Sequence, residues 1–457
     1  MPEKFEKVVN LCKRRGFVFP SSEIYGGFAG FYDYGPVGVE VVNNIKREWW
    51  KAMVHENLNI VGIDGAIITH PKVWEASEHV SKFIDFLIEC KKCKEKFRAD
   101  HLIEDKLKIK TEGLNKKQLE DIIKKNKLKC TKCGKELGEV EEFNLMFKTK
   151  VGPGKGEITY LRPETAQLIY LNFKNIINTS RQKIPFGIAQ IGKAFRNEIS
   201  PRDFLFRIRE FEQMEMQYFV KEKEADKFFK KWQEDRLNWF LNLGIKKNNI
   251  RIRKHIKKEL AHYAKQAVDI EYKFDFGWKE IEGIHNRGDF DLSQHEKFSG
   301  KDLKYFDEER KNKFIPWIIE TSAGVDRIFL AFLVDAYHEE KIKGEKRIVL
   351  KLHPKIAAYK VAVFPLVSKD NLPEKSREVY NLIKDSFPCF YDEKGSIGRR
   401  YRRMDEIGTP FCITIDHQTL KDDTVTIRDR DTTKQIRVKI LDLKKIVKEL
   451  INGKSKI

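Results

Sequence analysis

Two short arginine-containing segments, far apart in the chain, constrain its fold more than any other feature. One is Ala194-Phe-Arg-Asn-Glu-Ile-Ser-Pro201 and the other is Gly324-Val-Asp-Arg327. A guanidinium keeps its proton and binds phosphate oxygens through parallel N–H groups, so two of them suit a bent nucleoside triphosphate. The chain has no Gly-x4-Gly-Lys-Ser/Thr loop. We therefore expect any triphosphate to lie against arginines on a sheet.

Charge and apolar content exclude some classes of protein. The 457 residues carry a formal net charge of +20, which favours polyanions but also fits a lysine-rich surface. With 41% hydrophobic residues the chain can bury large cores. No run approaches the roughly 18 apolar residues of a membrane span, and the first residues are charged rather than apolar as in a signal peptide. We expect a cytoplasmic protein with reduced thiols and no membrane partner.

Four of the seven cysteines form two Cys-x-x-Cys pairs, Cys90 with Cys93 and Cys130 with Cys133. Two such pairs bring four thiolates to one metal and leave no open coordination position. The lysine-rich stretch between the pairs favours the thiolate forms. We predict a structural Zn²⁺ site. The alternative is a degenerate knuckle or incidental thiols.

Apolar periodicity predicts the main elements of the first 350 residues. A helix is expected to start at Pro36 and run to His55, with Val41, Ile45 and Trp49 on its buried stripe. The patterns that follow predict strands over 63–69, 184–195, 206–219 and 315–319, and a helix over 325–338.

The composition shifts near Leu352. Beyond it, strands are expected over 361–365, 411–415, 424–428 and 435–439, with helices over 373–386 and 442–452. Strands that alternate with helices over about a hundred residues indicate a separate α/β domain.

Several longer strings match one known pattern in the right order. They are Gly30-Phe-Tyr-Asp-Tyr-Gly-Pro36, His70-Pro-Lys-Val-Trp-Glu75, Arg162-Pro-Glu-Thr-Ala-Gln167, residues 187–202, Gly283-Ile-His-Asn-Arg287 and Gly398-Arg-Arg-Tyr-Arg-Arg403. With them the chain resembles the homodimeric glycyl-tRNA synthetases, a family of class II aminoacyl-tRNA synthetases. The resemblance implies an α+β fold with an antiparallel-sheet catalytic domain (1–89 and 141–352). A zinc-knuckle insertion (90–140) interrupts it, and an α/β anticodon-binding domain (353–457) follows.

The resemblance also implies the chemistry. Glycine is activated by ATP with Mg²⁺ to glycyl-adenylate and pyrophosphate, and is then transferred to the 3′ end of tRNA(Gly). Arg196 is expected on the α-phosphate and the incoming carboxylate, and Arg207 and Arg327 on the β,γ end, with Arg196 and Arg327 as the catalytic pair. For the remaining groups the resemblance implies that Glu198 contacts the adenine amino group, Phe211 stacks on adenine, and Glu280 and Glu320 ligate magnesium.

Further expectations concern glycine, tRNA and assembly. The glycine-binding candidates are Glu164, Glu215, Glu320 and Ser322, in a pocket too small for a methyl group. An editing module is then unnecessary, because no smaller amino acid competes. The anticodon-binding candidates are Arg399, Arg400, Tyr401, Arg402 and Arg403, and the helix from Pro36 is expected at a homodimer interface.

Two other interpretations are weaker. A synthetase-derived binding protein without catalysis should have lost Arg196, Glu198 or Arg327, and all three are present. A class II synthetase for alanine, serine or threonine is disfavoured by the Glu320/Ser322 pair and by the lack of an editing segment.

Overall fold

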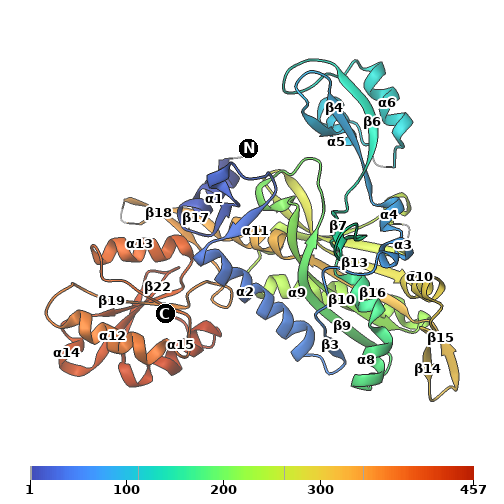
Figure 1. Ribbon diagram of the computed structural model, residues 1–457. Helices are drawn as coiled ribbons and strands as arrows, with labels where there is room; N and C mark the ends of the chain where they lie inside the picture. Colours follow the sequence, from blue (N-terminus) through green and yellow to red (C-terminus); the bar gives the residue numbers. More distant parts are fainter. Residues whose placement is uncertain (1–2, 112, 262, 343) are drawn as a thin grey trace.

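A computed structural model describes residues 3–457 except 112, 262 and 343. Its centre is a seven-stranded sheet (Figure 1). The strand order is β11 (Ile250–Lys254), β12 (Gln266–Phe274), β13 (Gly277–Gly288), β16 (Trp317–Gly324), β10 (Glu210–Val220), β9 (Phe186–Phe195) and β3 (Ile60–Gly62). Neighbouring strands are antiparallel except β3 and β9, which are parallel. The predicted α+β class is confirmed.

Helices cover both faces of this sheet. On one face, the largest apolar core is enclosed by α1 (Glu3–Arg14), α2 (Pro36–Trp50), α9 (Ala225–Asn242) and α11 (Val325–Ala336). On the other face, a smaller core lies under α7 (Ala166–Leu171), α8 (Phe173–Ser180) and α10 (Phe290–Ser299). These short helices leave part of the second face open, and the pocket described below lies there.

Helix α2 begins at Pro36, whose missing N–H costs nothing in the first turn. Val41, Ile45 and Trp49 are fully buried, so the predicted stripe is confirmed. The last part of the predicted helix is a π-helical turn, η2 (Lys51–His55).

The predicted strand over 63–69 is wrong, because the strand in this region is β3 (Ile60–Gly62). Beyond it the chain leaves the sheet. The Arg162 guanidinium donates to the Gly65 carbonyl, and the Thr159 hydroxyl donates to the Thr69 carbonyl. These two backbone carbonyls therefore accept hydrogen bonds from side chains, whereas in a strand they would accept from the backbone of a neighbouring strand.

The predicted strand over 315–319 starts and ends too early, since β16 runs from Trp317 to Gly324. Likewise β10 starts at Glu210 rather than at 206. The prediction misses the end of β16 because Glu320 is a charged residue on its pocket-facing side, which apolar patterning does not anticipate. It places the start of β10 too early because the Arg207 N–H donates back to the Arg202 carbonyl before the strand begins.

The insertion that carries the two Cys-x-x-Cys pairs stands apart from the body (Figure 1). Its sheet has the order β5 (Lys96–Arg98), β4 (Ile84–Cys90) and β6 (Leu137–Asn144), and its helices are α5 (Ala99–Leu107) and α6 (Lys116–Lys125). The insertion has its own apolar core, which includes Ile88, Leu102, Ile103 and Leu119. It therefore packs as a small separate unit.

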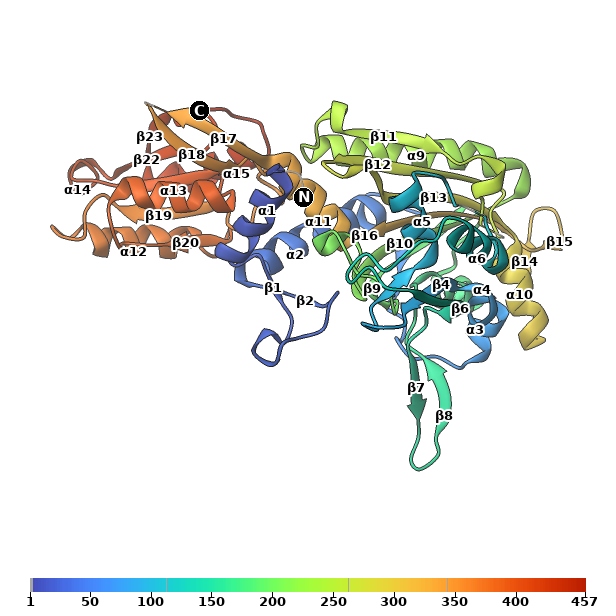
Figure 2. The same ribbon diagram turned by 90° about the horizontal axis from the view of Figure 1, so that it is seen from above.

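The C-terminal part is a mixed sheet flanked by helices (Figure 2). Its strand order is β20 (Cys389–Tyr391), β19 (Val361–Pro365), β21 (Phe411–Ile415), β22 (Thr424–Asp429) and β23 (Gln435–Lys439). The helices are α12 (Leu372–Ile383), α13 (Ile397–Ile407), α14 (Thr419–Asp422) and α15 (Leu443–Ile451). The predicted α/β character of this region is confirmed.

Short elements complete the fold. They are α3 (Lys72–Ala76), α4 (His79–Lys82) and the hairpins β1 (Val18–Pro20) with β2 (Tyr32–Tyr34), β7 (Lys148–Val151) with β8 (Glu157–Tyr160), β14 (Tyr305–Asp307) with β15 (Asn312–Phe314), and β17 (Tyr337–Ile342) with β18 (Glu345–Leu350). Hairpin β7–β8 projects from the body (Figure 2). Within the described residues, no helix combines the length and apolar character needed to cross a membrane.

Candidate active site

Strand β10 organises the site because its side chains alternate between the two faces of the sheet. Met214 and Met216 enter the large core, whereas Phe211, Gln213 and Glu215 face a cavity of about 300 Å³. The predicted ATP- and glycine-binding residues all line this one cavity: Glu164, Arg196, Glu198, Arg207, Phe211, Glu215, Glu280, Glu320, Ser322 and Arg327. The fold thus brings together residues that are far apart in sequence.

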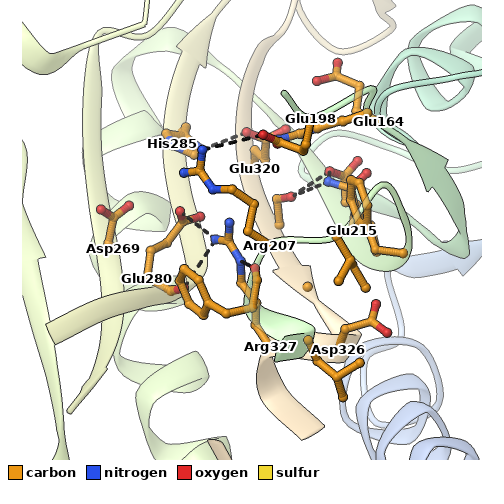
Figure 3. A pocket seen from close by; sticks show the side chains of 18 of the residues that line it. Glu164, Glu198, Arg207, Glu215, Asp269, Glu280, His285, Glu320, Asp326 and Arg327 are labelled. Carbon is orange, nitrogen blue, oxygen red and sulfur yellow. Dashed lines mark hydrogen bonds and ion pairs between the residues drawn. The ribbon is translucent and has the colours of Figure 1, made fainter. Parts of the chain in front are cut away.

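One part of the cavity contains two arginine–carboxylate pairs (Figure 3). Arg207 Nη1 lies 3.5 Å from Glu198 Oε2, and Arg327 Nη1 donates to Glu280 Oε2 over 3.0 Å. Arg327 Nε also donates to the Phe206 carbonyl, at 3.2 Å. The carboxylates hold the guanidinium groups in place.

Arg196 is held differently. Its Nε donates to the Pro163 carbonyl over 3.1 Å, and its Cζ lies 5.3 Å from the ring centres of both Phe83 and Phe211. No carboxylate in the described part of the chain forms an ion pair with it. Its guanidinium therefore remains available to an anion.

Asp326 fixes the helix that carries Arg327. The Tyr34 hydroxyl donates to Asp326 Oδ1 at 2.5 Å, and the Glu212 backbone N–H donates to Oδ2 at 3.0 Å. These contacts tie the first turn of α11 to β10. The carboxylate beside the second arginine therefore has a structural role.

The acidic part of the cavity is centred on Glu215. Strand register places it opposite Ser322. Ser322 Oγ donates to Glu215 Oε1 over 2.6 Å, Thr165 Oγ1 to Oε2 over 2.8 Å, and Gln213 Nε2 to Oε1 over 3.0 Å. These donors are neutral. Burial, together with the charges of Glu320 and Glu164, raises the pKa of Glu215 to about 8. Glu215 is therefore mostly protonated at pH 7.

Glu320 is already neutralised by basic groups. Arg287 Nη1 donates to its Oε1 over 3.0 Å, and the His285 ring nitrogen lies 2.7 Å from Oε2. Burial raises the pKa of Glu320, but Arg287 and His285 outweigh it and hold that pKa at about 2. The predicted Mg²⁺ role of Glu320 does not fit this arrangement. Both oxygens accept from nitrogen donors, and a divalent cation would face a buried guanidinium.

Glu164 also has a basic partner. His79 Nε2, on α4, lies 3.3 Å from Glu164 Oε2, and Gln167 Nε2 donates to Oε1 over 2.8 Å. Although burial acts in the opposite direction, His79 and Arg287 hold the pKa of Glu164 well below its usual range. Sequence reasoning assigned no role to His79, His285 or Arg287. His285 and Arg287 lie in the 283–287 string, whereas His79 carries no local signal.

The four knuckle cysteines converge at one end of the insertion. Their sulfur atoms all lie within 4.8 Å of one another, with 3.5 Å between Cys90 and Cys133 and 3.6 Å between Cys93 and Cys130. Zn–S bonds of about 2.3 Å in a tetrahedron separate sulfurs by about 3.8 Å. Backbone N–H groups of Cys93 and Lys92 favour the Cys90 thiolate and lower its pKa to about 6. A backbone N–H from Glu95 lowers the pKa of Cys93, but burial and the other three sulfurs outweigh it and raise that pKa, as expected when four thiols share one site. The cluster has the composition and spacing to bind a metal ion.

The predicted anticodon-binding string lies on α13, and part of that prediction is corrected. Arg400 is 1% exposed and donates to the Pro365 carbonyl over 2.6 Å. The hydroxyl groups of Tyr401 and Thr414 are 2.5 Å apart. Arg400 and Tyr401 hold the helix to its sheet, so neither is free to contact RNA.

The other arginines of this string lie nearer the surface. Arg399 is exposed, Arg402 pairs with Glu345 at 3.4 Å, and Arg403 pairs with Asp392 at 2.7 Å. The alternation of inward and outward side chains follows from the helical period.

Comparisons with known proteins agree with this geometry. Residues 147–337 match the family model described as "tRNA synthetase class II core domain (G, H, P, S and T)", and residues 360–450 match "Anticodon binding domain". A glycine–tRNA ligase of Caldanaerobacter subterraneus subsp. tengcongensis is 54% identical over 98% of this chain and 99% of its own length. The chain belongs to the glycine–tRNA ligase family. The predicted resemblance is confirmed.

Relatives of the same name occur in other bacteria. That of Treponema denticola is 52% identical over 95% of this chain and 94% of its own length. That of Clostridium tetani is 53% identical over 98% of both chains. Members of this class use ATP with Mg²⁺.

Proposed function

We propose that the protein activates glycine with ATP to glycyl-adenylate and pyrophosphate, and then transfers glycine to the 3′ end of its tRNA. The observation that carries this proposal is a single cavity with Arg196, Arg207 and Arg327 in one part and Glu164, Glu215, Glu320 and Ser322 in another. The arginines suit a triphosphate, and the acidic groups suit an ammonium ion.

Adenylate formation needs orientation and charge neutralisation rather than a protein nucleophile. In this proposal Arg196 binds the α-phosphate and the attacking glycine carboxylate. Arg207 and Arg327 exchange their carboxylate partners for the β- and γ-phosphates, while Glu198 contacts the adenine amino group and Phe211 its ring. Of the two predicted Mg²⁺ ligands, Glu280 keeps that role, since one carboxylate with phosphate oxygens suffices for this ion. Bound Mg²⁺ would screen the phosphate charges.

Glycine recognition rests on the acidic groups. The glycine ammonium lies among Glu164, Glu215, Glu320 and Ser322, and a side chain at Cα would displace these hydrogen-bonded groups. Selectivity is then steric, because glycine has no smaller competitor.

The deciding experiment is exchange of labelled pyrophosphate into ATP with each of the twenty amino acids. We expect glycine to support exchange, and alanine and serine to do so at least roughly 100-fold more slowly. Comparable exchange with alanine would indicate a synthetase for another amino acid. Failure of all twenty in folded protein would support a binding protein without catalysis.

We also propose that the four cysteines bind a structural Zn²⁺, and we expect about one zinc per chain by elemental analysis. Its removal by a chelator should speed proteolysis within 90–133 but leave glycine-dependent exchange largely intact. The reason is that the β4–β6 ladder, from Ile88↔Val140 to Ile84↔Asn144, separates the cysteines from the pocket.

Variants provide the matched comparison for this metal prediction. Cys130→Ser should lose the zinc, whereas Cys389→Ser, which changes a cysteine of the C-terminal sheet, should keep it. Purified protein without metal, or loss of exchange together with the zinc, would contradict the proposal.

The tRNA and dimer assignments complete the proposal. Exposed Arg399, with Arg402 and Arg403, is proposed to contact the anticodon loop, and Arg399→Ala should raise the KM for tRNA in aminoacylation.

The chain is proposed to form a homodimer through α2. The segment between β1 and β2, which precedes α2, has exposed apolar side chains such as Tyr25 and Phe28, whose exposed fractions are 88% and 80%. Such exposure agrees with a surface that a second chain covers. Light scattering that gave the mass of one chain would contradict it.

A further inference from the structure

The insertion is joined to the catalytic body through a narrow connection. We call this connection the neck and define it as residues 83–84 and 144–145. Ile84 pairs with Asn144 at the end of the β4–β6 ladder, and the Leu145 N–H donates to the Phe83 carbonyl over 3.0 Å. Both chain crossings therefore pass through one hydrogen-bonded pair of segments (Figure 1).

The neck contacts the 194–201 segment directly. The Asn197 N–H donates to the Leu145 carbonyl over 2.7 Å. One residue earlier, the Arg196 guanidinium lies 5.3 Å from the centre of the Phe83 ring. The neck of the insertion thus contacts Arg196, the residue proposed to bind the α-phosphate.

Phe83 is itself fixed by the body. It packs against the small apolar cluster of Val73, Trp74 and Met146. Its ring also makes an edge contact with His79, the partner of Glu164, at 5.5 Å between ring centres. A ring held in this way can orient a guanidinium.

An ion pair lies at the inner edge of the insertion, within electrostatic range of the pocket. Arg98 of β5 donates to Asp85 of β4 over 2.6 Å. Burial raises the pKa of Asp85 to about 6 although the Arg98 guanidinium lowers it, and the more distant charges of Glu198 and Arg207 raise and lower it respectively. The inner edge of the insertion therefore lies close to pocket residues.

Arg196 depends on aromatic rings more than its two neighbours do. Arg207 and Arg327 are each paired with a carboxylate, whereas the described contacts of Arg196 are a carbonyl and the rings of Phe83 and Phe211. If Phe211 turns to adenine when ATP binds, Phe83 is the ring that remains on the guanidinium.

We propose that Phe83 is a positioning residue for adenylate formation: from the neck of the insertion, its ring holds the Arg196 guanidinium in the orientation that the α-phosphate requires. The inference rests on the proposed function. It assigns this effect to the neck and not to the body of the insertion. Phe83 touches neither substrate and acts through Arg196.

The test compares Phe83→Leu, Phe83→Tyr and Phe97→Leu in glycine-dependent ATP–pyrophosphate exchange. Leucine keeps an apolar side chain but removes the ring face, so we expect kcat to fall roughly tenfold. The KM for glycine should change less than about threefold, because His79 keeps its contacts with Ser77 and Glu164. Phe83→Tyr restores the ring and should restore kcat. Phe97 lies in the core of the insertion, and Phe97→Leu should leave exchange unchanged.

A double-mutant cycle with Arg196→Lys tests the route. Lysine lacks the planar fork, so the effect of Phe83→Leu should shrink in that background. Wild-type kcat in Phe83→Leu, an equal loss in Phe97→Leu, or full additivity with Arg196→Lys would overturn the inference. If the wild-type protein shows no glycine-dependent exchange, the proposed function fails instead.

Discussion

Arg327→Ala is expected to abolish ATP–pyrophosphate exchange and leave the fold intact. Its guanidinium is proposed to neutralise the β,γ end of the triphosphate, where charge builds up as pyrophosphate leaves. Removing one such donor typically costs about 10²–10³ in rate, and the loss of a full charge should reach the upper end. Exchange with saturating glycine and ATP measures the effect.

Structural reasons make this variant a clean test. Arg327 donates to Glu280 and to the Phe206 carbonyl at the mouth of the cavity, and its side chain is 27% exposed. Its loss therefore leaves no deeply buried unpaired group. Circular dichroism and thermal melting should match the wild type. Arg310→Ala removes an exposed arginine from the β14–β15 turn and should keep full exchange. Near-wild-type exchange by folded Arg327→Ala would eliminate the assigned role.

Glycine binding is expected to release a proton from Glu215. The pKa of this carboxyl is raised to about 8, mainly by burial, so it is mostly neutral at pH 7. An ammonium ion favours the carboxylate, so binding below pH 8 requires proton loss. Apparent glycine affinity should therefore rise with pH, by about tenfold per pH unit, until it levels off near pH 8.

Burial is the main reason for the raised pKa of Glu215. Hydrogen bonds from Ser322 and Thr165 lower this pKa, but these donors are neutral and do not offset burial. The charges of Glu320 and Glu164 also raise the pKa of Glu215. The buried Arg162 guanidinium interacts electrostatically with the Glu215 carboxyl as well. The other two carboxylates keep their charge through Arg287, His285 and His79. Glu215 is thus the one expected to titrate near neutrality.

Glu215→Gln imitates the neutral form and should remove the proton linkage. Calorimetry of glycine binding at pH 7, in buffers of different ionisation enthalpy, should show about one proton released by the wild type and about none by the variant. At pH 8.5 the variant should bind glycine about 10²-fold more weakly, because a buried charge pair is lost. Glu210→Gln, on the same strand but paired with Lys193 away from the cavity, is the control. Equal proton release by wild type and Glu215→Gln would refute the assignment.

Local patterns predicted much of the fold, and the family resemblance predicted the candidate site. Alternation on β10 and the stripe of Val41, Ile45 and Trp49 follow from strand and helix periods, which are properties of neighbouring residues. The predicted ATP and glycine residues line one cavity, as the family resemblance implied. The outline of β16 was truncated at Glu320, since apolar patterning does not anticipate a charged residue on a central strand. Only the partners Arg287 and His285 make that position tolerable.

By itself, the sequence determined the family, the central sheet with its arginines, the paired cysteines and the C-terminal α/β region. These depend on residue type and on spacing along the chain. Only the tertiary structure decided that His79 pairs with Glu164, that Phe83 contacts Arg196, that Glu320 is neutralised from β13 and that Arg400 points into its sheet. Each of these contacts joins separate elements or sets which face of a helix is buried. The packing of the whole chain decides these contacts, so they cannot be predicted from a local sequence pattern.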